Sequence, residues 1–91
     1  MRKEYDYDYT IHPDNSPKKF EEVCRRLKDK GFGDGRLVVD VDGSTYQEYQ
    51  TKNGEVIVLD DYDIGAVYVL ADFNLSETLG SLIWKTHGKG A

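Results

Sequence analysis

Residues 36–71 read RLVVDVDGSTYQEYQTKNGEVIVLDDYDIGAVYVLA, and this stretch decides the fold. Apolar and aromatic residues recur in four runs, which are separated by Asp42-Gly43, by Asn53-Gly54 and by the acidic segment at residues 60–63. Short runs rich in β-branched and aromatic residues, punctuated by Gly-containing turn signals, are typical of antiparallel strands. The stretch therefore predicts a four-stranded antiparallel meander.

The register of this meander depends on its turns. Two-residue hairpin turns at Asp42-Gly43 and Asn53-Gly54 would place Val39 opposite Tyr46 and Tyr49 opposite Val58. Tyr46 and Tyr49 lie three residues apart and would point to opposite sides, so these turns do not produce one clean apolar face. A bulge, a longer first loop, or a sheet covered partly on both faces would each account for the pattern.

A further strand is predicted before the meander, because residues 5–12 alternate between two kinds of side chain. One face of this strand would carry Tyr5, Tyr7, Tyr9 and Ile11. The strand is expected to end near His12, because Pro13 cannot donate a hydrogen bond to a sheet ladder.

An amphipathic helix is predicted over residues 17–30. Ser16 is a favourable N-cap, and Pro17 is favourable at the first helical position. The apolar stripe of the helix consists of Phe20, Val23, Cys24 and Leu27. Gly31 fits the left-handed position that follows many helices. Acidic residues four positions before arginines favour a solvated polar face over a phosphate-binding one.

The C-terminal segment predicts a short helix over residues 75–84, with Asn74 as its cap. Gly80 weakens this helix, and a strand at residues 82–86 is the alternative. Residues 87–91 are expected to be loose. The chain is therefore expected to be a single α+β domain in the order β-α-β-β-β-β-α. Its antiparallel sheet has four to five strands, one long helix packs on a face, and a short helix ends the chain.

Length and composition narrow the possible functions. The 91 residues provide one small core, and a net charge of −5 disfavours direct binding to nucleic acid. The single cysteine, Cys24, forms no internal disulfide, and no apolar run reaches the about 20 residues that span a bilayer. His12 and His87 lack metal-ligand spacing, so neither metal nor cofactor is expected. The sequence predicts a cytoplasmic protein with a neutral or basic partner and no membrane role.

Residues 37–44, LVVDVDGS, resemble the nucleophile motif of haloacid-dehalogenase-type phosphatases, although Ser44 replaces the usual Thr. The resemblance implies that Asp40 attacks phosphorus, that Asp42 handles the leaving-group proton and that Mg²⁺ neutralises the phosphate. Those enzymes use a parallel sheet, whereas fewer than fifteen residues separate Asp42 from Val56, too few for a crossover helix. An Asp-Gly turn explains the same residues, so a metal-dependent phosphate-handling enzyme is kept as an alternative.

Acidic residues dominate the middle of the chain. Residues 37–77 contain nine Asp or Glu and one basic residue, Lys52, whereas residues 16–36 contain seven basic and four acidic residues. Carboxylates spaced along a rigid sheet can occupy a basic groove that otherwise holds nucleic acid. The residues expected to bind a partner are Asp60, Asp61, Tyr62, Asp63, Asp40, Asp42, Glu48, Asp6 and Asp8.

These features predict a small acidic protein-binding module without enzymatic activity. It would inhibit or antagonise a basic partner, such as a nuclease or other nucleic-acid-binding machinery, in the manner of phage anti-defence or immunity proteins. The comparison with those proteins rests on size and charge alone. A second alternative is a structural subunit that buries the tyrosine-rich strand in a homo-oligomer. An acidic surface that only maintains solubility would account for the same composition.

Overall fold

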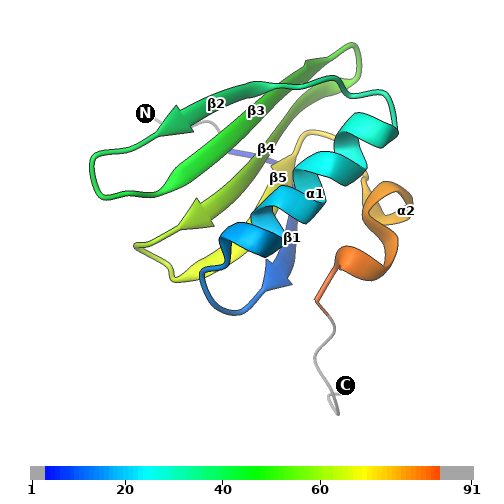
Figure 1. Cartoon of the computed structure of the whole chain (residues 1–91). Coiled ribbons are helices and arrows are strands. Elements are labelled where there is room, and N and C mark those ends of the chain that lie inside the picture. Colours follow the sequence, from blue (N-terminus) through cyan, green and yellow to red (C-terminus); the bar gives the residue numbers. More distant parts are fainter. Residues whose placement is uncertain (1–3, 85–91) are drawn as a thin grey trace.

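The computed structural model describes residues 4–84, which form a five-stranded antiparallel sheet with its helices on one face (Figure 1). The predicted element order and the α+β class are confirmed. The elements are β1 (Tyr7–His12), α1 (Pro17–Asp29), β2 (Arg36–Val39), β3 (Thr45–Thr51), β4 (Gly54–Asp61), β5 (Ala66–Ala71), α2 (Ser76–Leu79) and the 3₁₀ turn η1 (Gly80–Leu82). In space the strands follow the order β1-β5-β4-β3-β2, so β1 and β2 form the edges. His87 and the expected loose end at residues 87–91 lie outside the described residues.

Helix α1 begins and ends as its sequence predicts. The Ser16 hydroxyl accepts a hydrogen bond from the Lys19 amide at 3.1 Å, which satisfies one free amide of the first turn. At the other end Gly31 has a φ of 91°, and the Phe32 amide donates to the Leu27 carbonyl at 3.0 Å, which closes the helix. No helix within residues 4–84 combines the length and the apolar character needed to cross a bilayer.

Two apolar clusters hold the sheet, one on each face. On the helix face, α1 contributes Phe20, Val23 and Leu27, and the strands contribute Ile11, Tyr49, Val56, Val58, Val67, Val69 and Ala71. The opposite face is called the open face, and its buried apolar cluster consists of Ile57, Leu59 and Tyr68. Partly buried Tyr5 and Tyr46 pack against this second cluster. The structure therefore confirms that the sheet is covered on part of both faces.

The β2–β3 connection is longer than a two-residue hairpin. Val39 pairs with Thr45, which confirms the alternative of a longer first loop; the pairing of Val39 with Tyr46 that a two-residue hairpin would give is not formed. The Asp40 amide donates to the Ser44 carbonyl at 2.8 Å, and this bond closes a loop over residues 40–44. Two aspartates in the loop satisfy its own amides, which stabilises the longer connection.

The β3–β4 hairpin also turns at different residues from those predicted. Thr51 pairs with Gly54 and Tyr49 pairs with Val56, so the predicted pairing of Tyr49 with Val58 is wrong. The turn residues are Lys52 and Asn53, and Gly54 is the first residue of β4. The expectation that Tyr46 and Tyr49 point to opposite faces is confirmed, because they belong to the open-face and helix-face clusters respectively.

The two ends of the described chain differ in detail from their predictions. Tyr5 lies outside β1 and packs on the open face, where its hydroxyl donates to Glu55 at 2.8 Å. The prediction that Tyr5 shares a face with Tyr9 is therefore wrong. The C-terminal helix is confirmed but short, because Gly80 has a φ of 52° and ends α2 after one turn.

Candidate protein-binding surface

One end of the sheet, which we call the tip, is built from the β2–β3 loop at residues 40–44 and the β4–β5 turn at residues 62–65. In the first of these, the Gly43 amide donates to the Asp40 carbonyl at 3.0 Å, and Gly43 has a φ of 92°. Asp42 accepts a hydrogen bond from the Ser44 amide at 2.9 Å. Local hydrogen bonds of this kind fix the shape of a loop without burying it.

The β4–β5 turn is organised by the carboxylate of Asp61. Its Oδ1 accepts from the amides of Asp63 at 2.8 Å and Ile64 at 3.2 Å, and its Oδ2 accepts from the Tyr68 hydroxyl at 3.0 Å. The Gly65 amide donates to the Asp61 carbonyl at 2.7 Å. One buried side chain therefore holds the turn and connects it to the sheet.

The loop and the turn contact each other directly. Ser44 is fully buried, and its hydroxyl accepts a hydrogen bond from the Tyr62 amide at 2.8 Å. The Tyr62 ring lies against Gly43 so closely that a Cβ at this glycine would be 2.9 Å from Cε2 of the ring. The tip is therefore one connected surface formed by two chain segments.

Apolar side chains are exposed at the tip. Relative to a fully exposed residue, Val41 is 103% exposed, Ile64 is 66% exposed and Tyr62 is 50% exposed. Neither Val41 nor Ile64 belongs to an apolar cluster of the core. Exposed apolar groups that gather in one place on a small protein often mark an interaction surface.

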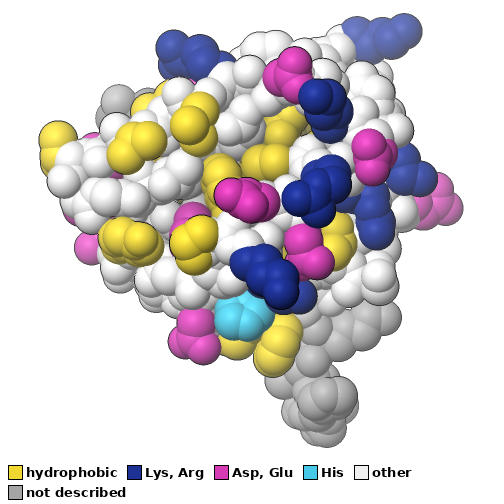
Figure 2. All heavy atoms as spheres, viewed as in Figure 1, with side chains coloured by type: hydrophobic (Ala, Val, Ile, Leu, Met, Phe, Trp, Pro, Cys, Tyr) yellow, Lys and Arg dark blue, Asp and Glu magenta, His cyan; other side chains and the backbone are white. Residues whose placement is uncertain are grey.

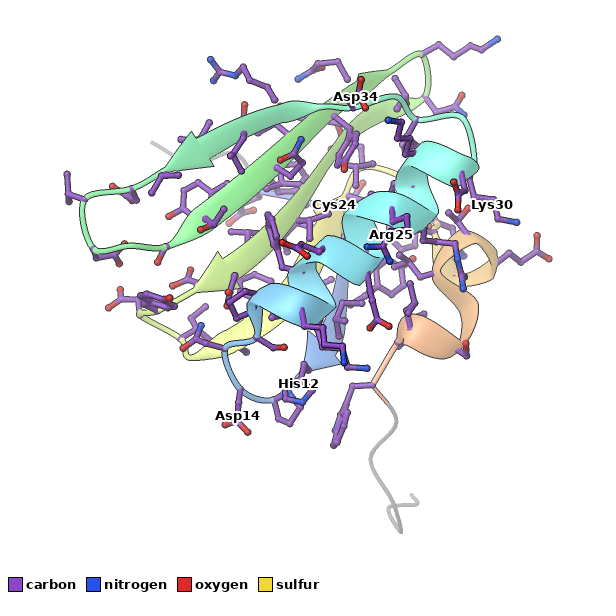
Figure 3. The ribbon with its side chains drawn as sticks, in the orientation of Figure 1. His12, Asp14, Cys24, Arg25, Lys30 and Asp34 are labelled. Carbon is purple, nitrogen blue, oxygen red and sulfur yellow. The ribbon has the colours of Figure 1, made fainter. Side chains whose placement is uncertain are left out.

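Acidic side chains surround these apolar groups. Asp40, Asp42 and Asp63 are all exposed at the tip. Figure 2 shows hydrophobic side chains over β2 and the tip, whereas most of the Lys and Arg side chains in this view lie over α1. Figure 3 shows Arg25 on α1 and Lys30 just after its end, both away from the tip. Asp and Glu side chains lie among the Lys and Arg side chains over α1, so basic and acidic side chains are mixed on this face of the molecule.

Two of the predicted site residues are internal. Asp60 is 4% exposed and accepts a hydrogen bond from Asn15 at 2.8 Å on the helix face. Asp61 is 6% exposed and lies on the open face with Tyr68. The expectation that both carboxylates contribute to the exposed acidic surface is therefore wrong. The physical reason is that both are acceptors for neighbouring donors that fix the ends of β1 and β4.

The remaining predicted residues divide between the tip and other parts of the sheet. Asp40, Asp42, Tyr62 and Asp63 meet at the tip. Glu48 lies within β3 and accepts a hydrogen bond from Arg36 at 3.1 Å. Asp8 lies on β1, with Asp6 just before it, at the edge opposite β2. The first strand does join the sheet, but it does not bring its carboxylates to the tip.

Sequence reasoning missed the apolar part of the tip. Val41 stands between two aspartates, and Ile64 stands between Asp63 and Gly65. An isolated β-branched residue inside an acidic turn has no strand face to occupy, and this is the signal that could have identified both.

The residues that resemble a phosphatase motif have other roles in this fold. Asp40 follows an edge strand of an antiparallel sheet, and its carboxylate accepts from the Val41 amide at 2.7 Å and the Tyr46 hydroxyl at 3.1 Å. The architecture therefore lacks the parallel sheet that the motif requires. Among the described residues, no three His, Cys, Asp or Glu side chains are grouped as metal ligands.

Comparison of the chain with protein-family models, with curated proteins and with solved structures gives no match. The geometry of the tip is therefore the basis for the functional argument that follows.

Proposed function

We propose that the chain is a protein-binding module whose tip docks on a basic protein and blocks it. The observation that supports this proposal is the combination of exposed Val41, Tyr62 and Ile64 with the carboxylates of Asp42 and Asp63 around them. Protein interfaces typically combine a desolvated apolar centre with a polar rim. Acidic rim charges accelerate association with a basic surface and disfavour acidic partners.

The proposed partner is a nuclease or another nucleic-acid-binding protein, because such proteins carry basic grooves that attract spaced carboxylates. The module acts by occupying the groove and carries out no chemistry of its own. The connection between the loop and the turn favours this role, since a preorganised surface loses little conformational freedom on binding. The proposal places this interaction in the cytoplasm, where a single unpaired cysteine such as Cys24 is usual.

The test begins with capture of the partner from the native host on the immobilised chain, followed by affinity measurements with the purified partner. Asp63→Lys and Ile64→Ser change exposed tip residues, so neither is expected to disturb the fold. Each should weaken binding by about 10-fold or more, and the Asp63→Lys effect should shrink as salt is added. Asp29→Lys and Glu21→Lys make equivalent charge changes on exposed residues of α1 and should leave the affinity unchanged.

Function is measured with the same variants. The wild-type chain should inhibit nucleic-acid binding by the captured protein, and an oligonucleotide duplex should displace the chain from it. Wild-type affinity in both tip variants would contradict the proposed surface. A captured partner that still binds nucleic acid while saturated with the chain would contradict the proposed antagonism.

A further inference from the structure

The outer edge of β2 is a second surface, which no other strand of the described residues 4–84 covers. Strand β2 pairs with β3 on one side and ends the sheet on the other. The Asp40 amide donates to the Ser44 carbonyl, which sets the phase of the backbone. The N–H and C=O groups of successive residues point to opposite sides of a strand. The backbone groups of Val38 therefore also point toward β3, whereas those of Leu37 and Val39 point outward.

We infer that β2 pairs with β2 of a second copy of this chain, antiparallel and centred on Val38, to form a homodimer with a continuous sheet. In this register Leu37 of each copy lies opposite Val39 of the other. Both residues direct their backbone groups outward, so each of these two pairs is a hydrogen-bonded pair of an antiparallel ladder. Val38 faces its own counterpart across the axis as a pair without hydrogen bonds. The pairing therefore uses every outward group of the strand in its correct phase.

The same register brings opposite charges together. Arg36 of each copy lies opposite Asp40 of the other, and directly opposed charges of opposite sign stabilise an antiparallel pair. Both side chains are already held on the open face. Arg36 donates to Glu48 at 3.1 Å, and Asp40 accepts from the Tyr46 hydroxyl at 3.1 Å. The twofold axis repeats the charge pair, so the edge is complementary to itself.

Apolar side chains gain contacts on the other face of the same pairing. Val38 pairs with Tyr46 of the open face, so Leu37 and Val39 on either side of it lie on the helix face. There Leu37 is 58% exposed and Val39 is 63% exposed. Across the axis the Leu37 and Val39 side chains of the two copies would form one continuous apolar row. This pairing supplies the partner that two exposed branched side chains on an edge strand otherwise lack.

The opposite edge of the sheet is protected against such pairing. The Trp84 amide donates to the Thr10 carbonyl at 2.8 Å, and the β1–β5 register shifts between Thr10 and His12. Asp8 and the neighbouring Asp6 place like charges along β1. Bulges, charges and covering segments are the usual protection of edge strands, and β2 has neither a register shift nor a covering segment among the described residues.

The test is sedimentation equilibrium of the full chain, with concentrations raised to about 1 mM because short edge pairings are weak. The mass should rise from the 10.4 kDa of one chain toward twice that value. Arg36→Asp and Asp40→Arg each place like charges across the axis, so each variant alone should remain monomeric. An equimolar mixture of the two should form a heterodimer, and the double variant R36D/D40R should regain the homodimer.

Matched controls carry the same charge changes elsewhere. Lys52→Asp lies in the β3–β4 turn and Asp14→Arg lies in the loop before α1, on the far side of α1 from β2 (Figure 3). Both should dimerise like the wild type. A wild-type chain that stays monomeric, a dimer that survives Arg36→Asp, or a mixture that fails to associate would each overturn the inference. Far-ultraviolet circular dichroism of every variant verifies that it is folded, and the heterodimer itself requires two folded chains.

Discussion

Asp61 is the residue at which structure and sequence make opposite predictions, and Asp61→Asn distinguishes them. An exposed binding residue would tolerate this isosteric change with no loss of stability. In the structure Asp61 is 6% exposed, and within residues 4–84 its carboxylate accepts hydrogen bonds from the Asp63 and Ile64 amides and the Tyr68 hydroxyl. We therefore expect Asp61→Asn to destabilise the folded protein.

The magnitude follows from the groups that Asn can replace. Its amide oxygen can still accept from the Asp63 and Ile64 amides, but its amide nitrogen cannot accept from Tyr68. The Asn nitrogen can only donate to the Tyr68 oxygen, so the charge-assisted hydrogen bond is replaced at best by a neutral one, and the bonds from the two amides are weakened. A bond to a charged group contributes about 1.5–3 kcal/mol. The expected loss of unfolding free energy is about 2–3 kcal/mol, a large fraction of the stability of a small domain.

The assay is urea denaturation of the wild type, of Asp61→Asn, of Tyr68→Phe and of the double variant. Because both single changes remove the same charge-assisted hydrogen bond, the double-mutant cycle should give a coupling energy of about 1 kcal/mol. Asp63→Asn, which changes an exposed neighbour, should alter the unfolding free energy by less than about 0.5 kcal/mol. A loss below about 0.5 kcal/mol for Asp61→Asn would refute the structural role assigned to this carboxylate.

Two further predictions concern the core and a hairpin. Burial and the hydrogen bond with Cys24 raise the pKa of Tyr49 above its ordinary value of 10.0, so above this pH the unfolded chain loses the phenol proton first. The contribution of Tyr49 to stability should be complete below pH 10.0 and then fall by up to about 1.4 kcal/mol per pH unit, and Tyr49→Phe should reduce this slope in urea titrations. Gly54 has a φ of 137°, and a Cβ there would lie 2.6 Å from Cβ of Asp72, so Gly54→Ala should cost more than about 2 kcal/mol. Gly33→Ala, at a φ of 86° with nothing within 4 Å, should cost about 1 kcal/mol, and equal losses at the two sites would contradict the close contact.

Elements with strong local signals were predictable from the sequence. Helix α1 has a cap at Ser16, a stripe at helical spacing and a closing Gly31, and all three signals agree because they act within one helix. The strands of the meander were identified for the same reason. Gly80, which weakens the predicted last helix, ends α2 because its positive φ is incompatible with a continuing helix.

Pairing between strands was less predictable, because it depends on loop hydrogen bonds that sequence letters do not specify. Asp42-Gly43 is compatible both with a two-residue hairpin and with the five-residue closure by Asp40 and Ser44. The longer loop is stabilised in part by the hydrogen bond that the Ser44 hydroxyl accepts from the amide of Tyr62, eighteen residues away. A contact of that range is settled only when the whole sheet forms.

The candidate site was predictable in part for a similar reason. Residues 60–63 form an acidic cluster in sequence, yet Asp60 accepts from Asn15 and Asp61 accepts from Tyr68, so their carboxylates point to opposite faces of the sheet. Period-two alternation separates neighbouring side chains in any strand, and β4 continues through Asp61. Only the residues beyond the strand end, Tyr62 and Asp63, remain available to a partner.

The two proposed surfaces have a defined relation in space. Each β2 strand runs toward its own tip, so antiparallel pairing about Val38 directs the two tips of the dimer to opposite ends of the joined sheet. Each tip is built entirely from one copy, because its loop and turn bond to each other within the chain. A monomeric Arg36→Asp chain should therefore retain the affinity of a single tip. What it loses is the second binding event, which increases avidity only toward a partner that is itself multivalent.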